Sequence, residues 1–318
     1  MKVLANDGIS SVGADKLRAA GYTVITDKIE QDNLIDGINE QNIEVVLVRS
    51  ATTVRQNVID ACPGIKLIGR GGVGMDNIDV QYARDKGIKV INTPASSSQS
   101  VAELVMGHMF AVSRFLHDSY KNMENGDFKT LKKNYGKGVE LRGKTLVIIG
   151  FGRIGQSLAS YALGCGMNVI AVDMFTETRE ITISIGNDME VTIDITPVSD
   201  LTSVIGQADY ISLHVPKQAD GSAVIGAKEF EMMKDGIRLV NAARGGVIDE
   251  DALLTALDNG KVAACALDVF ENEPNPRKDL LNHPKIACTP HIGAATSEAQ
   301  DRIGEELADL IIGEFGTF

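Results

Sequence analysis

Three side chains that can do polar chemistry each come shortly after a short apolar segment: Arg244, Glu273 and His291. If those segments are parallel strands, their carboxyl ends share one edge of a sheet, where α/β proteins bind ligands. An imidazole exchanges protons near neutral pH, and a guanidinium fork binds a carboxylate together with an adjacent oxygen. The combination favours chemistry on a small 2-hydroxy acid, with Glu273 orienting the His291 ring. Taken singly, Arg244 also fits a surface ion pair and His291 a packed histidine.

A glycine-rich turn supplies the place for a hydride acceptor. It follows the apolar run 145–149 and precedes a helical segment at 156–163. Between a strand and a helix, such glycines permit a tight turn and a close approach of pyrophosphate to the backbone, and the helix N-terminus binds the phosphates. The residues of this turn are Gly150, Gly152, Arg153, Ile154 and Gly155.

Asp173 ends the next apolar run, about 20 residues beyond the turn, where a carboxylate accepts hydrogen bonds from the ribose hydroxyls. Because a 2′-phosphate would be repelled there, the sequence predicts NAD as the cofactor, although Arg179 is only a few residues away. A strand end formed by His214, Val215 and Pro216 is a further cofactor-lining candidate.

The elements that position these residues alternate regularly between β-branched runs and helical patterns, which is typical of βαβ units and a parallel sheet. We therefore expect an α/β fold with two doubly wound parallel sheets. The predicted strands are 2–5, 22–26, 43–48, 65–68 and 89–91, then 145–149, 168–172, 210–215, 238–241, 262–267 and 286–288. Between the two series we expect a long helix with an apolar stripe over 101–116 and a polar loop over 122–137, and a final helix covers 297–312. Alternating residues at 180–196 predict an inserted β-hairpin.

The composition limits the class of protein and partner. A chain of 318 residues fits two domains, and a net charge of −12 disfavours nucleic acid and anionic membranes as partners. No run approaches the roughly 18 apolar residues of a membrane span, and no secretory signal is evident, so a cytoplasmic protein is expected. Widely spaced cysteines predict neither disulfides nor a metal site; they are Cys62, Cys165, Cys265 and Cys288.

The order of these motifs resembles the D-2-hydroxyacid dehydrogenase family, and the resemblance covers essentially the whole chain. The motifs are the glycine turn, Asp173, the runs 214–216 and 241–246, Asp268 with Glu273, and the run 289–296. Within the family, the run 70–79, residues 101–104 and the residues 296–300 are most similar to the phosphoglycerate dehydrogenases. That branch implies NAD-dependent oxidation of D-3-phosphoglycerate to 3-phosphohydroxypyruvate, the first step of serine biosynthesis.

The resemblance also implies roles for individual residues. Arg244 would bind the substrate carboxylate, His291 would be the acid/base, and Glu273 would support it. Backbone donors from Gly72 and Val73 would contact the substrate. The resemblance further assigns to the cofactor site Ala242, Ala243, Asp268, Gly293 and Ala294.

The family resemblance implies a discontinuous arrangement of domains. A smaller flavodoxin-like substrate domain, residues 1–93 with 296–318, would surround an inserted Rossmann NAD-binding domain of residues 94–295. A homodimer is expected. The sequence departs from the family pattern in three places. Ser97 stands where many phosphoglycerate dehydrogenases have Asn, the hairpin is extra, and the regulatory domain is missing. The last departure suggests a short form without serine feedback.

A phosphorylated 2-hydroxy acid is the expected substrate. Predicted strands deliver Arg49 with Ser50 at one end and Arg70 at another, so local positive charge is available for a distal phosphate. Lys132 or Lys133 of a partner subunit would assist. Arg49 and Arg70 also fit structural ion pairs, and a glyoxylate or hydroxypyruvate reductase, a D-lactate dehydrogenase, or an NAD(H)-sensing corepressor are the alternatives.

Overall fold

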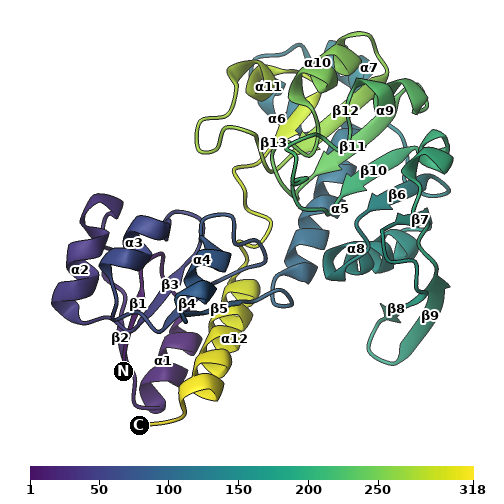
Figure 1. Cartoon of the computed structure of the whole chain (residues 1–318). Coiled ribbons are helices and arrows are strands. Elements are labelled where there is room, and N and C mark those ends of the chain that lie inside the picture. The colour runs from purple at the N-terminus through teal and green to yellow at the C-terminus, as the bar shows by residue number, and fades with distance from the viewer. The chain divides into compact units, whose positions relative to one another are not determined.

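The computed structural model describes residues 1–318, which form two compact units (Figure 1). One unit contains Met1–Ser98 and Ala294–Phe318, and the other contains Gln99–Gly293. Both units are built on parallel sheets flanked by helices, which confirms the expected fold class. The assignment of substrate binding to one part of the chain and NAD binding to the other stays a prediction. None of the helices combines the length and the apolar content needed to cross a bilayer.

The first unit has a parallel sheet of order β2-β1-β3-β4-β5, which is the flavodoxin-like order. Its strands are β1 (Lys2–Ala5), β2 (Thr23–Ile25), β3 (Val45–Val48), β4 (Leu67–Arg70) and β5 (Lys89–Asn92). All of β3 is buried, as expected for a central strand covered on both faces. Because the strand order reverses between β1 and β3, the residues that follow these two strands lie at the switch point where such sheets bind ligands.

Helices cover this sheet and join the two distant segments of the unit. They are α1 (Ser11–Ala19), η1 (Gln31–Asn33), α2 (Leu34–Gln41), α3 (Gln56–Ala61), α4 (Val80–Asp85) and α12 (Ser297–Phe315). The backbones of α1 and α12 touch at Gly13 and Gly304, since a Cβ on Gly13 would lie 2.5 Å from the Gly304 carbonyl carbon. Leu17 of α1 and Leu307 of α12 then share one core with the sheet. The last helix is thus an integral part of the N-terminal unit.

The second unit has a parallel sheet of order β13-β12-β11-β10-β6-β7. Its strands are β6 (Thr145–Ile149), β7 (Asn168–Val172), β10 (Tyr210–Leu213), β11 (Ile237–Asn241), β12 (Val262–Leu267) and β13 (Ile286–Cys288). A single parallel bridge from Val172 to Val198 continues the sheet beyond β7. With Val198 in the outer place, the order becomes that of a Rossmann sheet, with its switch point between β6 and β10.

The helices of the second unit include one that the sequence analysis missed. They are α5 (Ser98–Arg114), α6 (Leu116–Asn122), α7 (Phe128–Tyr135), α8 (Arg153–Gly164), α9 (Ala227–Met232), α10 (Glu250–Asp258) and α11 (Lys278–Asn282), with η2 (Leu201–Ser203) and η3 (Ile205–Gln207). The expected loop at 122–137 was wrong, because it contains α7. Asp127 caps this helix by accepting a hydrogen bond from the Thr130 N–H at 2.7 Å. The expected long helix breaks at Phe115, whose φ is +57°.

The inserted hairpin was predicted correctly and forms β8 (Arg179–Ile185) and β9 (Met189–Ile195). Its register pairs Ile181 with Ile193 and Ile185 with Met189, so the apolar residues share one face. Only the base of that face is covered: Ile181 is 2% exposed, whereas Ile185 is 52% exposed.

Candidate active site

The glycine turn joins β6 to α8 at the switch point of the second sheet. Gly150 has φ +91°, and a Cβ there would lie 2.5 Å from the His214 carbonyl oxygen. A Cβ on Gly155 would overlap the Gly150 carbonyl, which explains the close packing of helix on strand. Nothing lies within 4 Å of the Cβ position of Gly152. The turn therefore leaves open space at the N-terminus of α8, where the N–H groups of its first turn, from Arg153 onward, have no acceptor within the helix.

Asp173 follows β7 and faces the same turn. Its carboxylate accepts the Phe151 N–H at 2.6 Å and the Phe175 N–H at 3.0 Å. Since a carboxylate has about four acceptor positions, these two bonds fix its orientation and still leave capacity for ribose hydroxyls. The structure thus brings Asp173 and the glycine turn together, as a dinucleotide site requires.

His214 follows β10 beside the turn, and Val215 and Pro216 continue from it. Its Nε2 lies 2.8 Å from the Ser212 hydroxyl, and its Nδ1 is shielded from solvent without a partner. Burial lowers the pKa of this imidazole to about 4, so it is neutral near pH 7. A neutral ring fits a lining role for the cofactor better than a proton-transfer role.

His291 and Glu273 form a hydrogen-bonded pair at the carboxyl edge of the sheet. Nδ1 of His291 lies 2.7 Å from Oε2 of Glu273, and 38% of the His291 side chain is exposed. Oε1 of Glu273 accepts the Phe270 N–H at 2.9 Å, so both carboxylate oxygens are held. His291 has φ +53°, and its N–H donates to the Asp268 carbonyl at 2.8 Å. The ring is oriented through Nδ1, which leaves Nε2 for a substrate.

Arg244 follows β11, the strand next to the one that precedes Glu273. Asn241 shapes this turn: its Nδ2 donates to the Arg244 carbonyl at 2.9 Å, and its Oδ1 accepts the Ala243 N–H at 3.0 Å. The sequence analysis assigned no role to Asn241, although an asparagine at a strand end before a glycine-rich turn is a recognisable signal. Ala242 lies in the same turn.

The charges of the three side chains act on one another. Burial alone would raise the pKa of Glu273. The hydrogen bonds from His291 and Phe270 and the positive charges of His291 and Arg244 outweigh burial, so the pKa is lowered. Glu273 is therefore ionised near neutral pH, and it can stabilise a proton taken up by His291.

Asp268 holds the backbone that carries His291. This carboxylate is 1% exposed and accepts the Thr289 hydroxyl at 2.6 Å, the Ile292 N–H at 2.9 Å and the Gly293 N–H at 2.9 Å. Nε2 of His108, on α5, lies 3.0 Å from the Thr289 hydroxyl. Burial lowers the pKa of His108 despite the opposing charge of Asp268. The contact of His108 with this loop was not anticipated, because it joins residues far apart in the sequence.

The expected anion-binding residues lie in the first unit. Arg49 follows β3 at the switch point, with its N–H bound to Asp7 at 2.7 Å, and its half-buried guanidinium has no hydrogen bond or ion pair. Ser50 is exposed beside it. Arg70 ends β4, and its Nη1 donates to the Gly71 carbonyl at 3.2 Å. Arg49 is thus available for an anion, whereas Arg70 is engaged with its own turn.

The two expected backbone donors differ in availability. The Gly72 N–H donates to the Thr93 hydroxyl at 2.8 Å, and this glycine has φ +138° with the Arg70 guanidinium against it. Val73 is 38% exposed. A substrate role for Gly72 stays a prediction and requires sharing or release of its bond to Thr93. Ala294, expected to line the cofactor, accepts a hydrogen bond from Gln300 at 2.7 Å through its carbonyl.

Comparison with known proteins decides the family. Residues 106–293 match the model of the D-isomer specific 2-hydroxyacid dehydrogenase NAD-binding domain. The chain belongs to the D-2-hydroxyacid dehydrogenase family. The matched domain binds NAD in this family, whose members act on small 2-hydroxy acids, and the turn and Asp173 described above fit that cofactor.

Two relatives and one solved structure that are similar to this chain are named for different substrates. The chain is 43% identical over 296 residues to a hydroxypyruvate reductase of Thermotoga maritima, covering 92% of this chain and 91% of the relative. It is 40% identical over 311 residues to a D-3-phosphoglycerate dehydrogenase of Methanocaldococcus jannaschii, covering 98% of this chain but 57% of that relative. A glyoxylate reductase structure from Paecilomyes thermophila superposes with a TM-score of 0.80 at 29% identity, over 100% of this chain and 96% of the other. All three are similar to this chain over almost its whole length, whereas their named substrates differ.

Proposed function

We propose that this dehydrogenase catalyses the NAD-dependent oxidation of D-3-phosphoglycerate to 3-phosphohydroxypyruvate, and the reverse reduction. The pair of His291 and Glu273, 2.7 Å apart and within the electrostatic influence of Arg244, is the observation that supports the chemistry. The half-buried guanidinium of Arg49, which has no carboxylate partner, supports a phosphorylated substrate.

The three side chains would divide the work. Arg244 binds the substrate carboxylate and fixes the hydroxyl-bearing carbon. Nε2 of His291 accepts the hydroxyl proton as the C–H hydride departs, and Glu273 stabilises the resulting imidazolium through Nδ1. The cofactor, when bound, supplies the nicotinamide that accepts the hydride. In the reduction, His291 returns the proton to the carbonyl oxygen.

Hydroxypyruvate reduction is the second candidate. It is favoured by the Thermotoga maritima relative, which this chain matches over 91% of that relative's length, against 57% for the phosphoglycerate dehydrogenase. The same His291, Glu273 and Arg244 would serve both reactions, so only the site for the distal group separates them.

The test compares the wild type with Arg49→Ala on 3-phosphohydroxypyruvate and on hydroxypyruvate, by steady-state oxidation of NADH. Loss of a charge-assisted contact of about 1.4 kcal/mol should lower kcat/KM for the phosphorylated substrate about tenfold and leave the other unchanged. Arg84→Ala, which removes an arginine from α4 in the same unit, is the control. A wild type that prefers hydroxypyruvate, or equal losses on both substrates, would support the second candidate.

His291→Ala and Arg244→Ala test the roles common to both reactions. His291→Ala should keep NADH binding and lose about 10² to 10⁴ in kcat. Arg244→Ala should lower kcat/KM by one to several decades, because the substrate carboxylate loses its partner. Near wild-type activity in either variant would contradict the assignment.

A further inference from the structure

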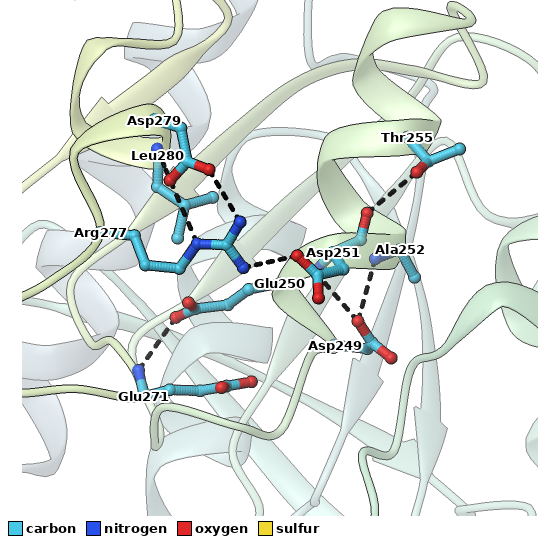
Figure 2. A network of polar contacts seen from close by, with 9 residues as sticks. All are labelled: Asp249, Glu250, Asp251, Ala252, Thr255, Glu271, Arg277, Asp279 and Leu280. Atoms are coloured by element: carbon cyan, nitrogen blue, oxygen red, sulfur yellow. Dashed lines mark hydrogen bonds and ion pairs between the residues drawn. The ribbon is translucent and has the colours of Figure 1, made fainter.

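Glu250, the first residue of α10, is a buried carboxyl group without a cationic partner in contact. It is 6% exposed, and its Oε1 accepts the Glu271 N–H at 2.9 Å (Figure 2). Its Oε2 is buried and has no partner. A buried polar atom without a hydrogen-bond partner destabilises the folded state. The hydrogen bond from the Glu271 N–H is the interaction that explains why a carboxyl group is present here.

The hydrogen bond between Glu250 and the Glu271 N–H fixes the loop that carries Glu273. Glu271 lies two residues before Glu273 in the sequence, and the Phe270 N–H just before it binds Oε1 of Glu273 at 2.9 Å. On another side, Gly245 lies against the peptide that joins Phe270 to Glu271, since a Cβ on Gly245 would overlap the Phe270 carbonyl. One peptide therefore lies in contact with the turn after Arg244 and is bound by Glu250.

The nearby cation, Arg277, forms its ion pairs with other carboxylates and not with Glu250. Arg277, further along the same loop, binds the exposed Asp251 of α10 at 2.6 Å and Asp279 of α11 at 2.7 Å (Figure 2). Burial raises the pKa of Glu250, which favours its neutral form. The loop thus depends on the position of an acceptor oxygen more than on a negative charge.

We propose that Glu250 is a positioning residue that holds Glu273 against His291 by fixing the Phe270–Glu271 peptide. This inference rests on the proposed roles of Glu273 and His291. If the Glu271 N–H is released, Glu273 loses its fixed orientation, and the His291 imidazolium loses part of its stabilisation.

Two variants of Glu250 in the full-length protein separate position from charge. Glu250→Gln keeps an oxygen at the same distance from Glu271, whereas Glu250→Asp keeps the carboxyl group and withdraws the oxygen by one methylene. We expect kcat within about twofold of wild type for the first and a fall of up to about tenfold for the second, the effect of one hydrogen bond. Asp251→Asn, which breaks an exposed ion pair on the same helical turn, is the matched control and should leave kcat unchanged.

The pH profile of kcat/KM for oxidation tells positioning from a merely structural role. With Glu273 loosened, the kinetic pKa of the acid/base group should fall, so that the acidic limb moves to lower pH in Glu250→Asp and stays in place in Glu250→Gln. Added to Glu273→Gln, Glu250→Asp should cause no further loss of kcat, because both changes act on one interaction.

Three results would overturn the proposal: an unmoved limb in Glu250→Asp, a loss that adds fully to that of Glu273→Gln, or an equal loss in Glu250→Gln. The substrate in these assays is whichever acid the wild type turns over fastest, so the outcome does not depend on the substrate assignment. If Glu273→Gln and His291→Ala themselves kept full activity, the proposed function would fail instead.

Discussion

Carboxylates at the edge of the second sheet serve two different purposes. The buried ones bind backbone N–H groups: Asp268 binds those of Ile292 and Gly293, and Glu250 binds that of Glu271. The partly exposed Glu273 instead binds an imidazole. Loops that carry reacting groups need such fixed support, because small displacements of the reacting atoms cost much of the rate. We expect the choice between NAD and NADP to depend in the same way on a single carboxylate, that of Asp173.

We expect Asp173→Ser to reduce the preference for NAD over NADP. The carboxylate that would bind the ribose hydroxyls and repel a 2′-phosphate is lost, so the ratio of kcat/KM values should fall about tenfold or more, equivalent to about 1.4 kcal/mol. Steady-state kinetics with both cofactors measure the ratio. Glu177→Gln, which removes an exposed carboxylate four residues away, should leave it unchanged. A wild type that uses both cofactors equally would contradict the role of Asp173.

The sequence predicted the bounds of those helices and strands whose apolar residues follow a regular pattern. The strands β6, β7, β12 and β13 begin and end where the pattern of apolar residues predicts, because a buried parallel strand is a continuous apolar run. The helix α7 was missed, since few of its residues are apolar and its main signal is the cap at Asp127. As the sequence predicted, Arg244, Glu273 and His291 each follow a strand of one sheet, and their roles stay predictions. Glu250 could not be found, because its function depends on a tertiary contact with a backbone N–H.

The inserted hairpin of β8 and β9 packs on the second unit through the base of one strand. Ile181 is buried in the core of the second unit, whereas Ile185 on the same strand is 52% exposed. We expect Ile181→Ala to lower the free energy of unfolding by about 2 to 4 kcal/mol through lost burial and a cavity, and Ile185→Ala by less than about 0.5 kcal/mol. Urea unfolding followed by circular dichroism measures both. Equal effects would mean that the hairpin does not pack on the unit through its base.

The partly buried His214, whose Nδ1 is shielded from solvent, should make the free energy of unfolding fall in acid. Its pKa is about 4 in the folded chain and 6.5 in the unfolded chain, so between about pH 4 and pH 6.5 the unfolded state binds a proton that the folded state does not. The contribution is full above pH 6.5 and is lost as the pH falls towards 4, by at most about 3 kcal/mol. Urea titrations at several pH values should show a shallower dependence in His214→Gln. Parallel curves for the two proteins would contradict this origin.

Association is the remaining property of the whole molecule. Large apolar side chains are exposed on three consecutive helices, α5, α6 and α7, and two of them are 90% and 66% exposed, Tyr120 and Phe128. Phe110 of α5 and Leu116 of α6 are exposed as well, and so is Met123, which directly follows α6. A monomeric protein rarely leaves so much apolar surface to water, and most soluble oligomers are symmetric dimers in which one surface meets its own copy.

We therefore expect a homodimer that uses these helices. Light scattering after size-exclusion chromatography should give the mass of two chains for the wild type, and Leu116→Glu combined with Phe128→Glu should give the mass of one. Each added carboxylate would be buried without a partner in the dimer, which costs several kcal/mol and raises the dissociation constant by orders of magnitude. Ile185→Glu, on the exposed face of the hairpin, is the control and should stay dimeric. A monomeric wild type at micromolar concentration, or dissociation by Ile185→Glu instead, would place the interface elsewhere.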